Sequence, residues 1–269
     1  MSVFKRVCGG LLIWACLSAQ GMAGVELRFC YPQKENFIFY TEGKDPRGPG
    51  ATVDHLLRIL DSLDARVHFV PVRMPWKRCW EALSQGKVDL LVAGHNAERD
   101  RLGVFPKKAG KLDEAAQFNF AHLCLVRRRG ERWGWDGIRF SNLTSLKLGI
   151  GAGMAGRASS PQVRLKHLSI WDGADPYALV RKRRVDAVLN LCKVKGVELP
   201  LSTFYSGTGL EMIRPAYIRA PVFLVASRNF ATRHSGLLDS LWRAQVMSED
   251  IYKKYILAFS TTETSTRLL

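Results

Sequence analysis

The stretch from Pro75 to Pro106 constrains the fold most, because a helix, a buried strand and a polar turn follow one another directly. Pro75 is expected at the first helical position, where a missing N–H costs nothing. The apolar side chains that follow recur at helical spacing and are Trp76, Cys79, Trp80 and Leu83. Gly86 is suited to the left-handed conformation that ends a helix. The apolar run of residues 88–93 then predicts a buried parallel strand.

A polar turn follows this strand and contains Gly94, Asn96 and Arg99. In open α/β sheets, ligands bind just outside the carboxyl ends of the strands. A guanidinium presents a planar fork of donors that matches a carboxylate, so Arg99 is predicted to be the main charged ligand contact. The alternative is that Arg99 pairs with a neighbouring surface acid and that Arg101 faces the ligand.

Strands and helices alternate along the rest of the chain. Residues 26–31 and 66–72 are expected strands, and the amphipathic helix of residues 51–64 lies between them, which predicts a parallel sheet with right-handed crossovers. Residues 107–114 are expected to form a polar loop. Later strands are expected at 118–126, 146–150, 185–190, 212–217 and 220–227, with a helix from Asp175, two closing helices and a frayed tail at 260–269.

The order of these segments resembles that of extracellular solute-binding proteins of amino-acid-type transporters, known as family 3. A helix, a basic step, Val-Asp and a strand occur twice, at Val88 and at Val185, which indicates two similar lobes. The resemblance implies a two-lobed α/β fold of the type II periplasmic-binding-protein class, with two parallel-type sheets flanked by helices and two hinge crossings. Residues 24–117 and 218–269 would form a discontinuous first lobe and residues 118–217 the second.

The resemblance also implies a set of ligand-binding residues, in which Arg99 occupies the place of the family's carboxylate clamp and Asn96 replaces a threonine. Aromatic side chains near the first strand and first helix would stack on the ligand, and backbone amides of a Gly-rich loop at residues 151–156 would hold its carboxylate. The expected residues are Tyr31, Phe39, Trp76, Gly94, Asn96, Arg99, Gly153, Met154 and Asn190. Asn190 and Leu191 stand where amino-acid binders place an aspartate for the ligand ammonium. A carboxylate-bearing or anionic solute is therefore preferred to an α-amino ligand.

The first 23 residues have the pattern of a secretory signal. Lys5 and Arg6 precede an apolar run that is too short to span a bilayer, and small residues precede a predicted cleavage after Ala23. Lipidation at Cys16 is the second choice, because Trp14 is bulky where lipoprotein signals favour a small residue. We expect a periplasmic, monomeric protein that has no nucleic-acid partner and delivers its solute to a membrane transporter permease or sensor receptor.

The whole chain has a net charge of +16, and 38 basic and 24 acidic side chains remain after the signal. This excess favours an anionic ligand or surface, or reflects solubility in an ionic milieu. The basic run at residues 181–184 is interpreted as a solvated helix end that complements the helix dipole.

Four cysteines remain after the signal, with three possible disulfide pairings, or they are buried thiols. Cys124 and Cys192 are predicted to pair, because both fall in strands of the second lobe. The other two are Cys30 and Cys79. Their spacing indicates no metal site, and no cofactor is expected.

An enzyme is the rival interpretation, because some relatives with this fold are dehydratases. No nucleophile–base motif stands out, and His95 is the one acid–base candidate. A third interpretation is a basic surface that binds anionic envelope polymer or lipid, which would depend strongly on salt.

Overall fold

The computed structural model describes residues 24–33, 38–41, 48–63, 66–151, 160, 162–170, 174–199, 208–244 and 246–266, with residues 259–266 described by their backbone alone. The predicted signal and the loop residues Gly153 and Met154 lie outside these ranges. None of the helices in this part of the chain is long and apolar enough to cross a membrane.

The first lobe begins with the expected alternation of strands and helices. Its elements are β1 (Val25–Pro32), α1 (Ala51–Ser62), β2 (Val67–Met74), α2 (Trp76–Ser84), β3 (Leu90–Ala93) and α3 (Ala97–Leu102). Strand β1 lies between β2 and β3 and is parallel to both, which confirms the predicted parallel sheet. Pro75 lies one residue before α2 in an extended conformation, and not inside the helix as predicted. Gly86 has the predicted left-handed backbone, with φ of 69°.

The second lobe is built on long strands that leave the first lobe. Its elements are β6 (Asn119–Arg128), β7 (Gly134–Trp135), β8 (Phe140–Ser141), β9 (Ser145–Gly151), β10 (Arg164–Ile170), α4 (Pro176–Arg181), β11 (Ala187–Val194) and β12 (Val197–Glu198). Asp175 caps α4 as expected, because its carboxylate accepts the Tyr177 N–H at 2.8 Å. The chain returns through β13 (Leu210–Ala226) and ends in α5 (Arg228–Arg233), α6 (Ser235–Arg243) and α7 (Glu249–Thr266).

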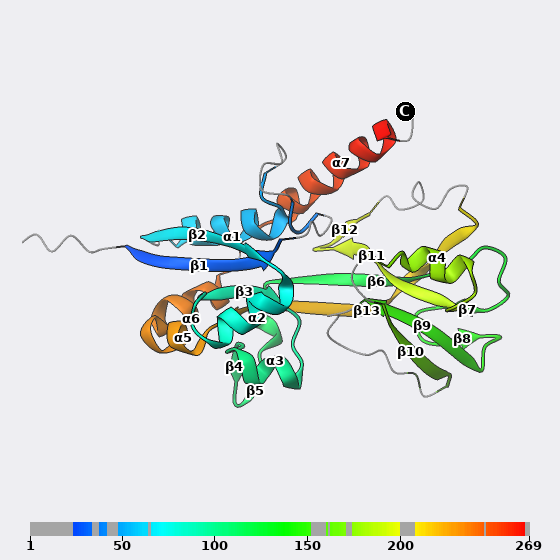
Figure 1. Ribbon diagram of the computed structural model, residues 1–269, viewed down its shortest axis with the longest axis horizontal. Coiled ribbons are helices and arrows are strands. Elements are labelled where there is room, and N and C mark those ends of the chain that lie inside the picture. The colour runs from blue at the N-terminus through cyan, green and yellow to red at the C-terminus, as the bar shows by residue number, and fades with distance from the viewer. Residues whose placement is uncertain are drawn as a thin grey trace, which may run out of the picture.

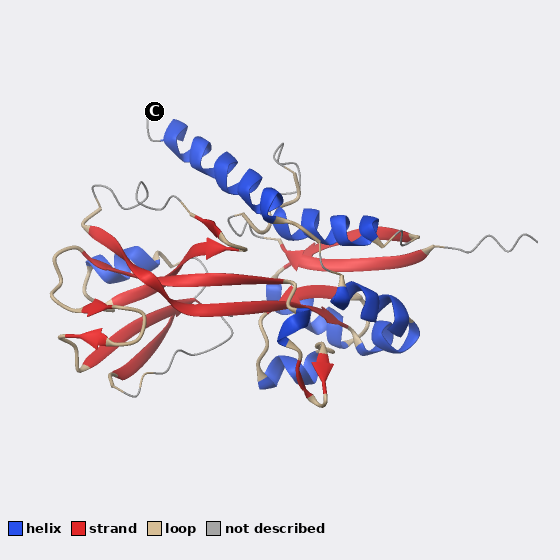
Figure 2. Cartoon of the chain, turned by 180° about the vertical axis from the view of Figure 1, so that it is seen from behind, coloured by secondary structure: helices blue, strands red, loops and turns tan. Residues whose placement is uncertain are grey.

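One continuous path of strands joins the two lobes, in the order β10-β9-β11-β6-β13-β3-β1-β2. The predicted sheets of the two lobes share β13, which runs beside β6 from one lobe into the other (Figure 1). The two strands expected at 212–217 and 220–227 are a single strand, whose register against β6 shifts between Ile213 and Ile218. Figure 2 shows these two strands from behind, with most helices gathered at the first lobe.

Two further expectations are corrected. The loop at residues 107–114 contains a short hairpin, β4 (Lys107–Lys108) with β5 (Lys111–Leu112), followed by the 3-10 helix η1 (Glu114–Ala116). The tail is helical to Thr266, because α7 continues beyond residue 260.

Buried side chains divide into clusters that follow the lobes. Leu27, Phe29 and Leu56 belong to the core between the first-lobe sheet and its helices. Tyr252 of α7 packs in a cluster with Cys124 and Cys192 of the second lobe. Because α7 also contacts α1, the terminal helix binds both lobes together on one side.

Candidate functional site

Three parallel strands of the first lobe end together and place polar and aromatic side chains at one edge. Tyr31 near the end of β1 is paired in register with Arg73 near the end of β2, and Gly94 directly follows β3. We call the region formed by Tyr31, Arg73, Trp76, Gly94 and Arg99 the carboxyl edge. Such edges are where ligands bind in open α/β sheets.

The turn after β3 is organised by Asn96 and Arg99. The Asn96 side chain caps α3 by accepting the Arg99 backbone N–H at 2.8 Å, an arrangement that satisfies a free helix N–H. The Arg99 Nη1 group donates to the Gly94 carbonyl oxygen at 2.9 Å. Asn96 therefore acts first as a helix cap, and Arg99 is folded back over the turn.

Two tryptophans of α2 support the Arg99 guanidinium. Its central carbon lies 5.5 Å from the centre of the Trp80 ring, and Trp76 meets Trp80 edge to face at 5.9 Å. Arg99 is only 9% exposed, and burial lowers the pKa of its guanidinium. The indole Nε1 of Trp80 is buried and has no hydrogen-bond partner within the described ranges. The predicted residues Trp76, Gly94, Asn96 and Arg99 thus form one connected group.

Arg73 is a member of this edge that the sequence analysis did not select. Its guanidinium lies 5.7 Å from the Tyr31 ring centre, and Nη2 donates to the Gln33 carbonyl at 2.7 Å. Its Nε is buried and has no hydrogen-bond partner among the described residues. Arg73 lies opposite Tyr31 because β1 and β2 pair in parallel register. The alternation of strands and helices in the sequence predicts this pairing, so it could have identified Arg73.

Tyr31 is buried and stacks on Tyr40, with ring centres 5.5 Å apart. Burial raises the pKa of its phenol, and the nearby Arg73 partly offsets this. Phe39 is placed differently, since its ring meets Tyr252 of α7 edge to face at 6.5 Å. Phe39 therefore packs between the lobes and the terminal helix.

Among the second-lobe residues expected at the site, the structure describes Asn190, whereas Gly153 and Met154 lie outside the described residues. Asn190 lies within β11, where it is paired in register with Cys124 of β6. Gly151 is the last residue of β9. The described residues contain no group of three histidine, cysteine or acidic side chains that could hold a metal ion.

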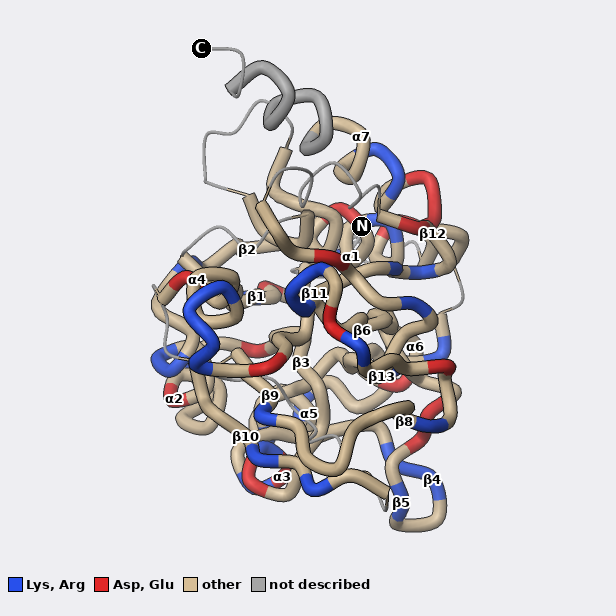
Figure 3. Tube along the Cα trace, turned by 90° about the vertical axis from the view of Figure 1, so that its right-hand side faces the viewer, with Lys and Arg blue, Asp and Glu red and all other residues tan. Residues whose placement is uncertain are grey.

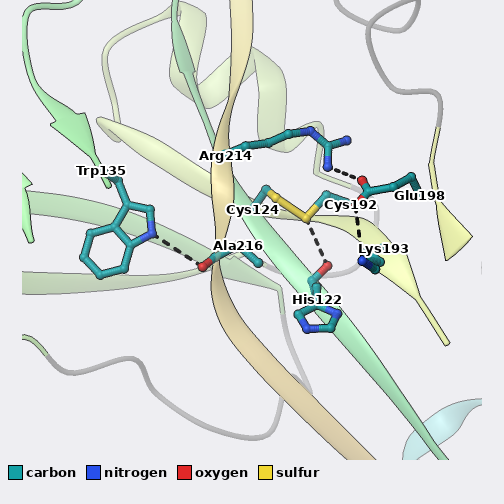
Figure 4. Close-up of a disulfide and its surroundings, with 8 residues drawn as sticks. All are labelled: His122, Cys124, Trp135, Cys192, Lys193, Glu198, Arg214 and Ala216. Atoms are coloured by element: carbon teal, nitrogen blue, oxygen red, sulfur yellow. Dashed lines mark hydrogen bonds and ion pairs between the residues drawn. A yellow bond between two sulfur atoms is a disulfide. The ribbon is translucent and has the colours of Figure 1, made fainter. Parts of the chain in front are cut away.

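Two disulfides stabilise the strands around these positions. The predicted Cys124–Cys192 bond is confirmed and joins the neighbouring strands β6 and β11, with Cα atoms 5.7 Å apart (Figure 4). The second bond joins Cys30 of β1 to Cys79 of α2. It fixes the helix that carries Trp76 and Trp80 to the strand that carries Tyr31.

The arrangement of strands is shared with solved binding proteins. A probable amino-acid ABC transporter extracellular-binding protein from Bacillus subtilis is 16% identical, with a TM-score of 0.55 over 88% of this chain and 97% of that one. An ancestral arginine-binding protein bound to arginine is 21% identical, with a TM-score of 0.53 over 87% and 99%. This chain has the two-lobed fold of periplasmic binding proteins.

An ancestral amino-acid-binding protein, described as a precursor of cyclohexadienyl dehydratase, also shares the fold. It is 18% identical, with a TM-score of 0.52 over 87% of this chain and 94% of that one. No family model matches the sequence. No curated protein matches it either.

Proposed function

We propose that this protein binds a small carboxylate-bearing or anionic solute at the carboxyl edge and delivers it to a membrane transporter or sensor. The fold supports binding between two lobes, because the proteins that share it are solute-binding proteins by their descriptions. The proposal includes export to the periplasm with a mature chain that begins at Gly24.

The observation that carries this proposal is the pair Arg73, near the end of β2, and Arg99, in the helix that follows β3; these two strands flank β1. Both guanidinium groups lie over aromatic rings, and each donates to a backbone carbonyl. Aromatic faces and backbone acceptors hold a guanidinium in place without neutralising its charge. Two positioned cations are suited to an oxyanion, whereas they would repel the cationic side chain of an arginine-like ligand.

Two of the acids near these arginines have other partners, while Glu98 acts electrostatically on Arg99. Asp89 is buried and bonds to Arg28 at 2.9 Å, and Asp100 pairs with Lys107 at 2.7 Å. We expect the positive charge that remains at this edge to attract an anion where water is partly excluded. Charge-assisted bonds from a guanidinium fork are about twice as strong as neutral ones.

We further propose that residues 24–117 with 218–269 form one lobe and residues 118–217 the other, joined by β6 and β13. Closure of the lobes about these strands would bring second-lobe donors, including Gly153, Met154 and Asn190, toward the solute. Tyr31, Trp76, Gly94 and Asn96 would complete the site on the first lobe, and Phe39 would respond to closure through its contact with α7.

A screen of thermal stability tests the proposal. Amino acids, carboxylates, sugars and polyamines are added separately, and a ligand that binds only the folded protein raises stability by about 2.7 kcal/mol at 100 times its Kd. We expect the shift from a carboxylate or another anion. Stabilisation by sugars or polyamines alone would contradict the anionic site.

A dehydratase-like activity is a second candidate, favoured by His95 beside the carboxyl edge. Its Nε2 lies 3.5 Å from the Asp100 carboxylate, an arrangement that orients an imidazole for proton transfer. The same carboxylate also holds Lys107. Incubation of each stabilising carboxylate with the protein, followed by mass spectrometry, would detect loss of water. An unchanged ligand would remove this candidate.

A further inference from the structure

A basic cavity lies on the second lobe, away from the carboxyl edge. Its volume is about 420 Å³, and its charged lining residues are Arg128, Arg129, Glu131, Arg181 and Arg183. We call it the outer cavity. The end of β6 and the end of α4 meet there, at the right of Figure 1, whereas α2 and α3 lie in the first lobe. The basic stretch that follows α4 is visible in Figure 3.

Two of the arginines are held by intramolecular contacts. The side chain of Arg128 donates to the Val180 and Val185 carbonyls at 2.9 and 3.2 Å and to Glu131 at 2.6 Å. Arg181 pairs with Asp175 at 3.0 Å. These contacts fix the frame of the cavity and neutralise much of the charge that the two arginines bring.

The other two arginines leave a positive charge at the opening. Arg129 and Arg183 are exposed, and neither side chain has a hydrogen bond or ion pair among the described residues. Arg129 and Arg183 come from segments more than 50 positions apart in the sequence. A solvated end of α4 would explain the exposed charge of Arg183 but not that of Arg129. Two guanidinium groups that face one cavity are the usual protein partners of phosphate oxygens.

The size of the cavity sets the class of ligand. A water molecule takes up about 30 Å³ in the liquid, so the outer cavity has room for a phosphate group together with an organic substituent.

The backbone at Arg183 is left-handed, with φ of 57°, and its N–H and that of Arg184 bond to carbonyls of the last turn of α4. Glycine is the usual residue in this helix-ending position. Arg183 therefore places a cation at the cavity although its left-handed backbone is less favourable for arginine than for glycine.

We propose that the outer cavity binds a phosphate group through Arg129 and Arg183, with Arg128 and Arg181 holding its walls. The phosphate belongs either to a free phosphate or phosphomonoester or to the headgroup of an anionic phospholipid. This site is independent of the solute site at the carboxyl edge.

The test compares Arg183→Gly and Arg129→Ala/Arg183→Gly with a control of equal charge change, Arg139→Ala/Arg164→Ala. Both control arginines are exposed on the second lobe and do not line the cavity. Binding of inorganic phosphate is measured by calorimetry at low ionic strength. Binding to phosphatidylglycerol vesicles is measured by cosedimentation, with phosphatidylcholine vesicles for comparison.

We expect the double cavity variant to bind at least tenfold more weakly and the control variant to stay within twofold of the wild type. An effect on inorganic phosphate alone identifies a free phosphate, and an effect on phosphatidylglycerol vesicles identifies a lipid headgroup.

Arg183→Gly should also raise Tm by about 2–4 °C, because glycine relieves the left-handed backbone. A damaged fold cannot produce weaker binding together with a higher Tm. Equal losses in the control and cavity variants, or no binding to either probe, would overturn the proposal.

Discussion

Arg99 at the carboxyl edge and Arg183 at the outer cavity carry the same charged group in opposite surroundings. Arg99 is 9% exposed, lies over Trp80 and donates to the Gly94 carbonyl, whereas Arg183 is exposed and has no side-chain partner in the described part of the chain. Water and salt weaken the attraction of an exposed charge, while a partly buried charge keeps more of it. We therefore expect the carboxyl edge to select a ligand by shape and the outer cavity to attract one mainly by charge.

The two regions also differ in what their disulfides fix. Cys30–Cys79 joins a strand to the helix that carries the tryptophans of the carboxyl edge, and Cys124–Cys192 joins two paired strands (Figure 4). Only the first bond therefore connects elements that both supply residues to the carboxyl edge.

The largest predicted effect comes from removing these bonds. The sequence separations are 49 and 68 residues, so the chain-entropy model gives a loss of about 4 kcal/mol in the free energy of unfolding for Cys30→Ala/Cys79→Ala and for Cys124→Ala/Cys192→Ala. Urea unfolding measures both losses. Solute affinity should fall only in the first variant, because α2 is no longer held to β1. Equal affinity in the two variants would show that the first bond does not shape the site.

A smaller effect concerns His55 of α1, which is 2% exposed and packs against Tyr252 of α7. Its Nδ1 lies 3.3 Å from the Tyr252 hydroxyl, and burial lowers the pKa of the imidazole to about 3. In the unfolded chain the His55 imidazole is protonated as the pH falls below 6.5. In the folded protein it stays neutral until about pH 3. Stability is therefore complete above pH 6.5 and decreases as the pH falls, by about 3 kcal/mol at pH 4.5.

Urea unfolding of His55→Gln at pH 7 and pH 4.5 checks this expectation. The substitution keeps polar atoms near Tyr252 but removes the titration, so this part of the pH dependence should disappear. His68→Gln is the matched control, because His68 is exposed on β2 and should leave the pH dependence unchanged. The same pH dependence in the wild type and in His55→Gln would contradict the assignment.

Sequence patterns predicted the first lobe better than the second for a physical reason. Strands β1 and β3 are buried and the helices are amphipathic, so their apolar residues recur with a clear period. Strand β10 was missed because it is paired only on one side and most of its side chains are exposed. Strand β13 was predicted as two strands, at 212–217 and 220–227, whereas it is continuous and its register against β6 shifts between Ile213 and Ile218.

The candidate sites show the same limit. The predicted turn that contains Arg99 is local in sequence, so its position at a strand end could be inferred. Arg73 depends on pairing between β1 and β2, and the outer cavity depends on β6 meeting α4. These contacts join residues far apart in the chain, and no short motif records them.

The proposed solute site rests on Arg99, and the conservative replacement of this residue has the smallest predicted effect. Arg99→Lys keeps the charge but loses the fork and its geometry, so affinity for the solute found by the screen should fall by about tenfold, or 1.4 kcal/mol. Arg101→Lys is the matched control, because Arg101 lies two residues away on the same helix and is exposed. Calorimetric titration of the wild type and both variants, at a temperature where all are folded, compares them directly. A tenfold loss in Arg99→Lys with wild-type affinity in Arg101→Lys is the result we predict, and wild-type affinity in Arg99→Lys would contradict a solute site built on this arginine.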